Sequence, residues 1–102
     1  MNDAASQGAD AEIGALRRTL SIANKRGLHA RAAAKFVRTV AQYEAVVRVS
    51  FKGQDVSGLS IMGLMMLAAG IGSDIELSCS GRQAADAMAA LSALIESKFG
   101  ED

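Results

Sequence analysis

Hydrophobic and polar residues alternate along four stretches of the chain, which is the pattern of half-buried strands. In the first stretch, Leu16, Leu20 and Ile22 fall at even spacing with polar side chains between them. Gly53 and Gln54 separate two later stretches, which predicts a hairpin with its turn at these two residues. The expected strands span residues 16–24, 45–51, 55–57 and 73–80.

The segments between the strands repeat their apolar residues every three or four positions, which predicts amphipathic helices. Phe36, Val37 and Val40 show this spacing in the first helix. The second helix is expected to begin at Ser60 and to end at Gly70, because glycine commonly terminates a helix. The expected helices span residues 30–42, 60–70 and 84–95.

The elements follow the order strand, helix, strand, strand, helix, strand, helix. Because each strand is apolar on one side only, this order predicts an α+β open-faced sandwich, a sheet covered by helices on one face. A chain of 102 residues, half of them hydrophobic, suffices for one domain with its own core. We place the domain at residues 15–102 and expect the small, polar residues 1–14 to form a disordered N-terminal extension.

The overall composition excludes several classes of function. Eleven basic and eleven acidic residues cancel, and three Phe and one Tyr are the only aromatic residues. A nucleic-acid-binding sheet needs stacking aromatics and a basic stripe, so we expect no nucleic-acid partner. One His and one Cys cannot form a zinc site, and no glycine-rich nucleotide loop is present. We therefore expect neither a metal nor another cofactor.

The cysteine and the N-terminus indicate where the protein works. Cys79 is the single cysteine and alternates with Ile75 and Leu77, so we expect it in the core and in its reduced form. The N-terminal residues have neither the basic leader nor the apolar run of a signal peptide. No apolar stretch is long enough to cross a membrane. These features predict a cytoplasmic protein that does not insert into membranes.

The only histidine, His29, lies where a tight turn is expected to become a helix. Gly27 permits a sharp turn just before it, and the unpaired N–H groups of the first helical turn form an anion site beside the ring. Arg31 adds a planar cation suited to phosphate oxygens. This positive environment disfavours the imidazolium form, so we expect a neutral, nucleophilic ring. The alternative is an ordinary polar surface histidine.

Two segments carry a resemblance to a known family. Residues 27–37, GLHARAAAKFV, closely resemble the active-site stretch of HPr, the histidine-containing phosphocarrier of the bacterial phosphotransferase system. Residues 58–67, GLSIMGLMML, resemble the second-helix segment of that family, and the likeness runs from about residue 15 to 98. The resemblance implies a four-stranded antiparallel sheet in the order 1-4-2-3 with three helices on one face.

The resemblance also implies a relay function. His29 would accept a phosphoryl group on Nδ1 from phosphorylated enzyme I and pass it to an enzyme IIA. Arg31 would stabilise the phosphate, together with the backbone N–H groups of Ala30 and Arg31. Such a protein is a carrier with a covalent intermediate rather than an independent turnover enzyme, and a monomer is the simplest assembly. The family usually has proline where this chain has Ala32, so we expect a slightly less rigid active-site turn.

Ser60 has two interpretations. From its position it is a helix N-cap, with its hydroxyl accepting from a backbone N–H. By resemblance it matches the serine that HPr kinase/phosphorylase modifies, and a phosphate there would add negative charge to a binding face. The two roles are compatible.

The helix after Ser60 has more apolar residues than one face can bury. We expect Leu64, Leu67 and Ala68 in the core. The remaining residues would form a partly exposed surface for enzyme I and the acceptor proteins, because exposed methionines suit several partners. That surface comprises Ile61, Met62 and Met65.

Basic residues outside this surface are expected to be solvated. They are Arg17, Arg18, Lys25 and Arg26, of which the last two could steer an acidic partner to the loop.

Two alternatives to the sugar-transport relay stay open. One is a regulatory HPr-like binding module controlled through Ser60 without phosphate relay. The other is a carrier in the nitrogen-related phosphotransferase chain.

Overall fold

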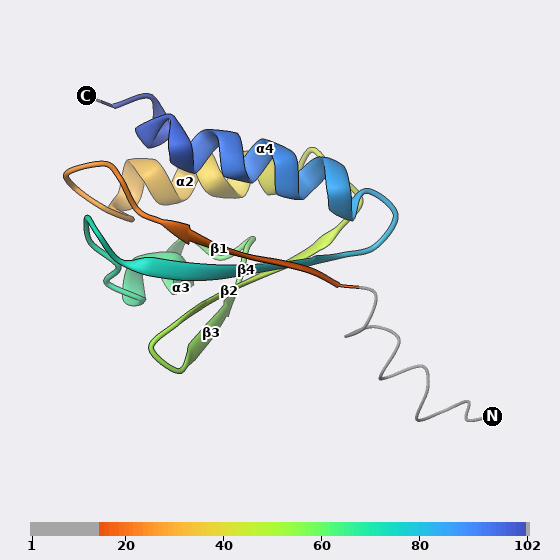
Figure 1. Cartoon of the computed structure of the whole chain (residues 1–102), viewed down its shortest axis with the longest axis horizontal. Helices are drawn as coiled ribbons and strands as arrows, with labels where there is room; N and C mark the ends of the chain where they lie inside the picture. The colour runs from red at the N-terminus through yellow and green to blue at the C-terminus, as the bar shows by residue number, and fades with distance from the viewer. Residues whose placement is uncertain (1–14, 102) are drawn as a thin grey trace.

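The protein is described by a computed structural model over residues 15–101. Its strands form one antiparallel sheet in the order β1-β4-β2-β3, and α2 and α4 lie side by side across one face (Figure 1). The α+β sandwich and its strand order are thereby confirmed. The elements are β1 (Leu16–Ser21), α2 (Ala30–Val40), β2 (Val46–Phe51), β3 (Gln54–Ser57), α3 (Ile61–Met66), β4 (Asp74–Ser80), α4 (Ala84–Glu96) and the 3-10 helix η1 (Lys98–Gly100).

The expected N-terminal extension, residues 1–14, lies outside the described residues, as does Asp102. Within the described part, no helix combines the length and the apolar character needed to span a membrane. The short helix α3 packs against α2 and β3.

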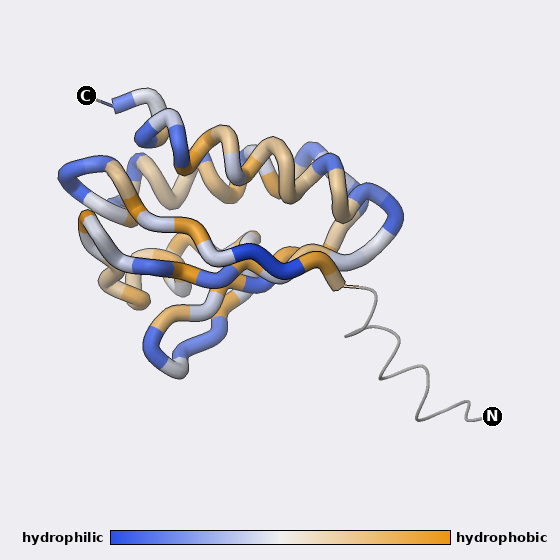
Figure 2. Tube along the Cα trace, in the orientation of Figure 1, coloured by the Kyte–Doolittle hydropathy of each residue, from blue (hydrophilic) through white to orange (hydrophobic). Residues whose placement is uncertain are grey.

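The core lies between the sheet and the helices. β4 is a central strand, and its inward side chains Ile75, Leu77 and Cys79 are all fully buried. Phe36 of α2 and Leu91 of α4 close the core from above, and Figure 2 shows α4 hydrophobic along much of its length. Burying such side chains contributes about 1.5–3 kcal/mol each. Burial also raises the pKa of the Cys79 thiol, which agrees with the core role predicted for it.

The hairpin turn differs from the prediction by one residue. Phe51 pairs with Gln54, so Lys52 and Gly53 form the two-residue turn and Gln54 begins β3. Both turn residues have positive φ angles, 49° and 80°. Turns of this kind suit hairpins because their twist matches that of the strands. The pairing of the two strands, rather than the residue types, therefore determines which residues form the turn.

Helix α3 is shorter than predicted. It ends at Met66 rather than at Gly70, and Ala68 adopts a φ of 56°. Ala68 is exposed, so its predicted place in the core is wrong, whereas Leu64 and Leu67 are buried as expected. The left-handed residue turns the chain so that Ala69 is buried in its place.

Arg18 lies on the helix-facing side of β1 although it is charged. Its guanidinium donates to Ser92 Oγ of α4 at 2.7 Å, and the Ser92 side chain is buried. The Arg18 side chain is exposed, as predicted, but its guanidinium hydrogen-bonds the buried hydroxyl of Ser92. Leu16, at the start of this edge strand, is 42% exposed and contributes less to the core than its spacing predicted.

Candidate functional site

His29 is the N-cap residue of α2. Its backbone is extended, with φ −73° and ψ 177°, and its carbonyl accepts the first helical hydrogen bond from Ala33 at 2.8 Å. Within residues 15–101 its side chain caps no N–H group of the helix. The backbone N–H groups of Ala30 and Arg31, in the first turn, therefore have no hydrogen-bond acceptor within the helix, as at every uncapped helix start.

The loop before His29 is pinned to the loop after α3. Leu28 donates its N–H to the Ala69 carbonyl at 3.0 Å. Gly27 has a φ of 65°, and a Cβ atom there would collide with that carbonyl and lie 2.7 Å from Gly70 Cα. Only glycine satisfies both conditions, so the loop path that delivers His29 depends on Gly27.

The start of α3 contrasts with the start of α2. Ser60 Oγ accepts from the Gly63 N–H at 2.9 Å, which confirms the predicted N-cap role. One N–H group of α3 is therefore capped by a side chain, whereas the His29 side chain caps no N–H group of α2.

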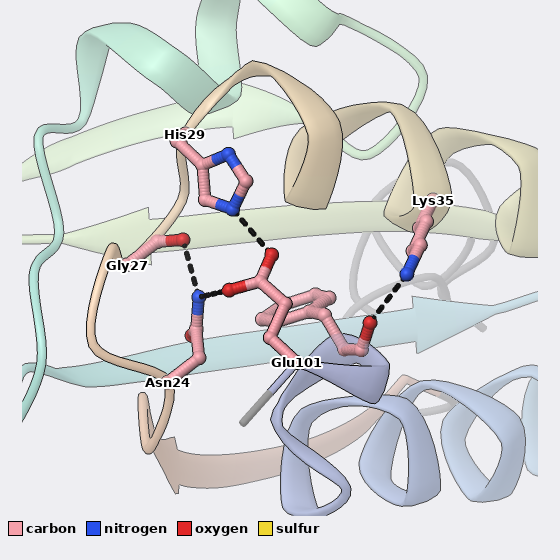
Figure 3. Close-up of polar contacts among 6 residues, drawn as sticks. Asn24, Gly27, His29, Lys35 and Glu101 are labelled. Atoms are coloured by element: carbon pink, nitrogen blue, oxygen red, sulfur yellow. Dashed lines mark hydrogen bonds and ion pairs between the residues drawn. The ribbon is translucent and has the colours of Figure 1, made fainter.

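A residue that the sequence analysis missed lies against the ring. Glu101, beyond η1 near the C-terminus, contacts His29 Nε2 through Oε2 (Figure 3). Asn24 donates from Nδ2 to Glu101 Oε1 at 3.0 Å and to the Gly27 carbonyl at 2.8 Å. The other ring nitrogen of His29, Nδ1, points away from Glu101 (Figure 3). The imidazole side chain is 14% exposed, so it is partly accessible to solvent.

The Glu101 carboxyl is held in its charged form. The hydrogen bond from Asn24 lowers its pKa most, desolvation opposes this as the second effect, and His29 and then Lys35 lower the pKa further. The sequence analysis, which lacked Glu101, considered only the helix start beside the ring.

The cations near His29 differ in their partners. Arg31 is exposed, and no carboxylate among residues 15–101 pairs with it. Lys35 instead donates to the Phe99 carbonyl at 2.6 Å, which ties α2 to η1. Lys25 and Arg26, in the loop between β1 and α2, are exposed as expected.

The apolar residues of α3 form a second feature beside the loop. Ile61, Met62 and Met65 are 41%, 70% and 39% exposed, and Met66, which the sequence analysis did not single out, is 72% exposed. We refer to these four residues as the α3 patch. Because the chain after α3 bonds directly to Leu28, the helix bearing the patch is linked to the His29 loop.

Comparisons with known proteins identify relatives of the chain. The family described as "PTS HPr component phosphorylation site" matches residues 16–97. A phosphocarrier protein HPr of Cupriavidus necator is 49% identical over 86 residues, covering 84% of this chain and 97% of the relative. A phosphocarrier protein NPr of Shewanella violacea is 38% identical over 86 residues, covering 84% of this chain and 94% of the relative.

Solved structures give the same picture of the fold. HPr from Thermoanaerobacter tengcongensis matches with a TM-score of 0.82 and 42% identity, covering 85% of this chain and 98% of the other. A structure of an HPr dimer from the same organism matches with a TM-score of 0.68 and 44% identity, covering 80% of this chain and 94% of the other.

Proposed function

Because the chain belongs to the HPr family of phosphocarrier proteins of the phosphotransferase system, we propose that His29 carries the phosphoryl group on its Nδ1 atom. The observation that supports this most is the position of the ring at the start of α2, where its side chain leaves the first-turn N–H groups uncapped. Those donors and the dipole of an 11-residue helix favour an anion beside the ring.

The chemistry is a reversible in-line transfer. The Nδ1 lone pair attacks the phosphorus on phosphorylated enzyme I, the bond from phosphorus to the donor atom breaks, and its electron pair stays with the donor. The reverse step passes the group to an enzyme IIA. Negative charge spreads over the three equatorial oxygens in the transition state. The N–H groups of Ala30 and Arg31 and the guanidinium of Arg31 stabilise that charge without reorganising.

The α3 patch is the proposed docking surface for enzyme I and the enzyme IIA proteins. Its exposed methionines are flexible and adapt to more than one partner. Lys25 and Arg26 supply positive charge on the His29 loop and would steer an acidic partner toward it. The encounter takes place between a monomer of this chain and one partner at a time, in the cytoplasm.

Ser60 is the proposed regulatory residue, modified by HPr kinase/phosphorylase. A phosphate on its hydroxyl adds nearly two negative charges at the start of α3, next to the apolar surface that partners would use. Phosphorylation of Ser60 should therefore weaken docking without touching His29.

The nitrogen-related phosphotransferase chain is the second candidate. The 38% identity to a phosphocarrier protein NPr supports this chain as a candidate function in addition to the sugar-transport chain. Transfer from the phosphorylated protein to purified enzyme IIA proteins of each type distinguishes the two, because the true acceptor should be labelled at the higher rate.

Incubation with labelled phosphoenolpyruvate and enzyme I tests the relay. We expect one phosphoryl group per chain, labile in acid and stable in base, as a phosphoramidate is. The variant His29→Ala should take up no label. Equal labelling of His29→Ala and the unchanged chain would overturn the proposal. Mass spectrometry of the protein from growing cells tests the alternative, because serine phosphate without histidine phosphate would favour the regulatory module without relay.

A further inference from the structure

We infer that Glu101 and Asn24 are positioning residues for the phosphoryl transfer, acting through the hydrogen bond to His29 Nε2. The inference rests on the proposed function of His29 and deepens it. It concerns which nitrogen of the ring is free to react, and it starts from the contacts drawn in Figure 3.

Glu101 determines which ring nitrogen carries the proton. An ionised carboxylate can only accept hydrogen bonds, so His29 Nε2 must be the N–H that donates to it. A neutral imidazole has a single N–H, and Nδ1 is therefore left with a bare lone pair. That lone pair is on the nitrogen pointing away from Glu101 (Figure 3). The carboxylate thus leaves unprotonated the nitrogen that the relay would use as its nucleophile.

Asn24 in turn fixes the carboxylate. Its side chain is fully buried, and Nδ2 donates to both Glu101 and the Gly27 carbonyl. Asn24 Oδ1 is buried without a hydrogen-bond partner in the described residues. Flipping the amide would not help, because Oδ1 would then face two oxygen acceptors. The chain tolerates an unsatisfied acceptor here, which indicates that the donor edge of Asn24 is required.

The end of the chain is anchored, so Glu101 is not on a free tail. Phe99 is fully buried in the core, and its carbonyl accepts from Lys35 Nζ at 2.6 Å. These two contacts hold η1 against α2 and deliver the next turn of chain to the ring. Lys35 and His29 are the charged or titratable groups facing the carboxylate.

The same contact acts during the transfer. As the bond from Nδ1 to phosphorus forms, positive charge develops on the ring while its proton stays on Nε2. A carboxylate accepting from Nε2–H stabilises that charge, as in the triads where an acid orients a histidine. Glu101 does not touch the phosphoryl group and takes no proton, which is why its role is positioning.

The test measures Glu101 variants in two ways, by NMR of the unphosphorylated protein and by the rate of its phosphorylation. In the full chain labelled with ¹⁵N-histidine, NMR should show a slowly exchanging His29 Nε2–H that disappears in Glu101→Ala. The rate of phosphorylation by enzyme I should fall about tenfold in Glu101→Ala. A loss of this size is common when the hydrogen-bond partner that orients a metal-ligating histidine is removed. Glu101→Gln keeps an acceptor without charge and should restore the Nε2–H signal but only part of the rate.

Controls separate this role from general stability and from failure of the relay. Glu96→Ala removes an exposed glutamate of α4 and should change neither readout. Asn24→Ala should weaken the Nε2–H signal, and if it does not fold, the Glu101 variants decide alone. An unchanged Nε2–H signal and rate in Glu101→Ala would overturn the inference. If the unchanged chain is never phosphorylated, the proposed function fails, while the NMR comparison still decides whether Glu101 orients the ring.

Discussion

Gly27 is the residue that allows the chain to bring His29 to the start of α2. It combines a left-handed backbone with a close approach to the Ala69 carbonyl, two conditions that no other residue type meets without strain. Its neighbour Leu28 is buried and hydrogen-bonded to that same carbonyl. The position of the His29 ring therefore depends on a residue that has no side chain of its own.

Replacing Gly27 by alanine should destabilise the protein by about 1–3 kcal/mol, because the new Cβ is strained and collides with backbone. Gly53→Ala is the matched control, since Gly53 also has a positive φ but no heavy atom within 4 Å of the added Cβ. Urea unfolding should show the larger loss for Gly27→Ala, and only that variant should transfer phosphate more slowly. Equal losses would show that the approach to Ala69 is unimportant.

At the scale of elements, regular periodicity could be predicted and element ends could not. β4 and α4 carry their apolar residues at unbroken spacing, and both form where the sequence placed them. Nothing in Leu67, Ala68 or Ala69 signals a helix end, because all three favour helices. α3 nevertheless stops there, since burying Ala69 and bonding its carbonyl to Leu28 requires the left-handed turn.

The cap at the start of α3 gives the prediction at this scale. Ser60→Ala removes the acceptor for the Gly63 N–H and should lower the free energy of unfolding by about 1 kcal/mol. Ser60→Asp retains a capping oxygen and should keep most of the stability. Urea unfolding of both variants measures the difference. Should Ser60→Ala unfold at the same urea concentration as the unchanged chain, the cap does not stabilise the fold.

At the scale of the whole molecule, the site joins two segments that are distant in sequence. His29, Gly27 and Arg31 could be predicted as a cluster because they are neighbours along the chain. Glu101 could not, because 72 residues separate it from His29 and no local pattern links the two. One signal was available in retrospect. Phe99 is a lone aromatic residue in an otherwise polar C-terminal segment, which suggests an anchor in the core.

The Glu101 contact predicts a pH dependence of stability. Its pKa is lowered in the folded protein by Asn24 first, so folding favours the carboxylate over the protonated acid. The resulting stabilisation is complete above the unfolded value of about 4.5 and is lost as the pH falls through the lowered pKa. The unchanged chain should therefore exceed Glu101→Gln in free energy of unfolding at pH 7, and the gap should close toward pH 3.

Urea unfolding at both pH values measures this difference. Glu96→Gln, which alters an exposed side chain, serves as the control and should show no such closing gap. A difference between the unchanged chain and Glu101→Gln that is the same at pH 7 and pH 3 would mean that the carboxylate charge does not stabilise the fold.

The most direct test of the account asks which atom holds the phosphoryl group. The ¹⁵N-labelled chain, phosphorylated by enzyme I and phosphoenolpyruvate, can be studied by NMR for coupling between phosphorus and the ring nitrogens. We predict coupling to Nδ1 of His29, with Nε2 still protonated. Phosphorus bonded to Nε2, or to a residue other than His29, would contradict the account.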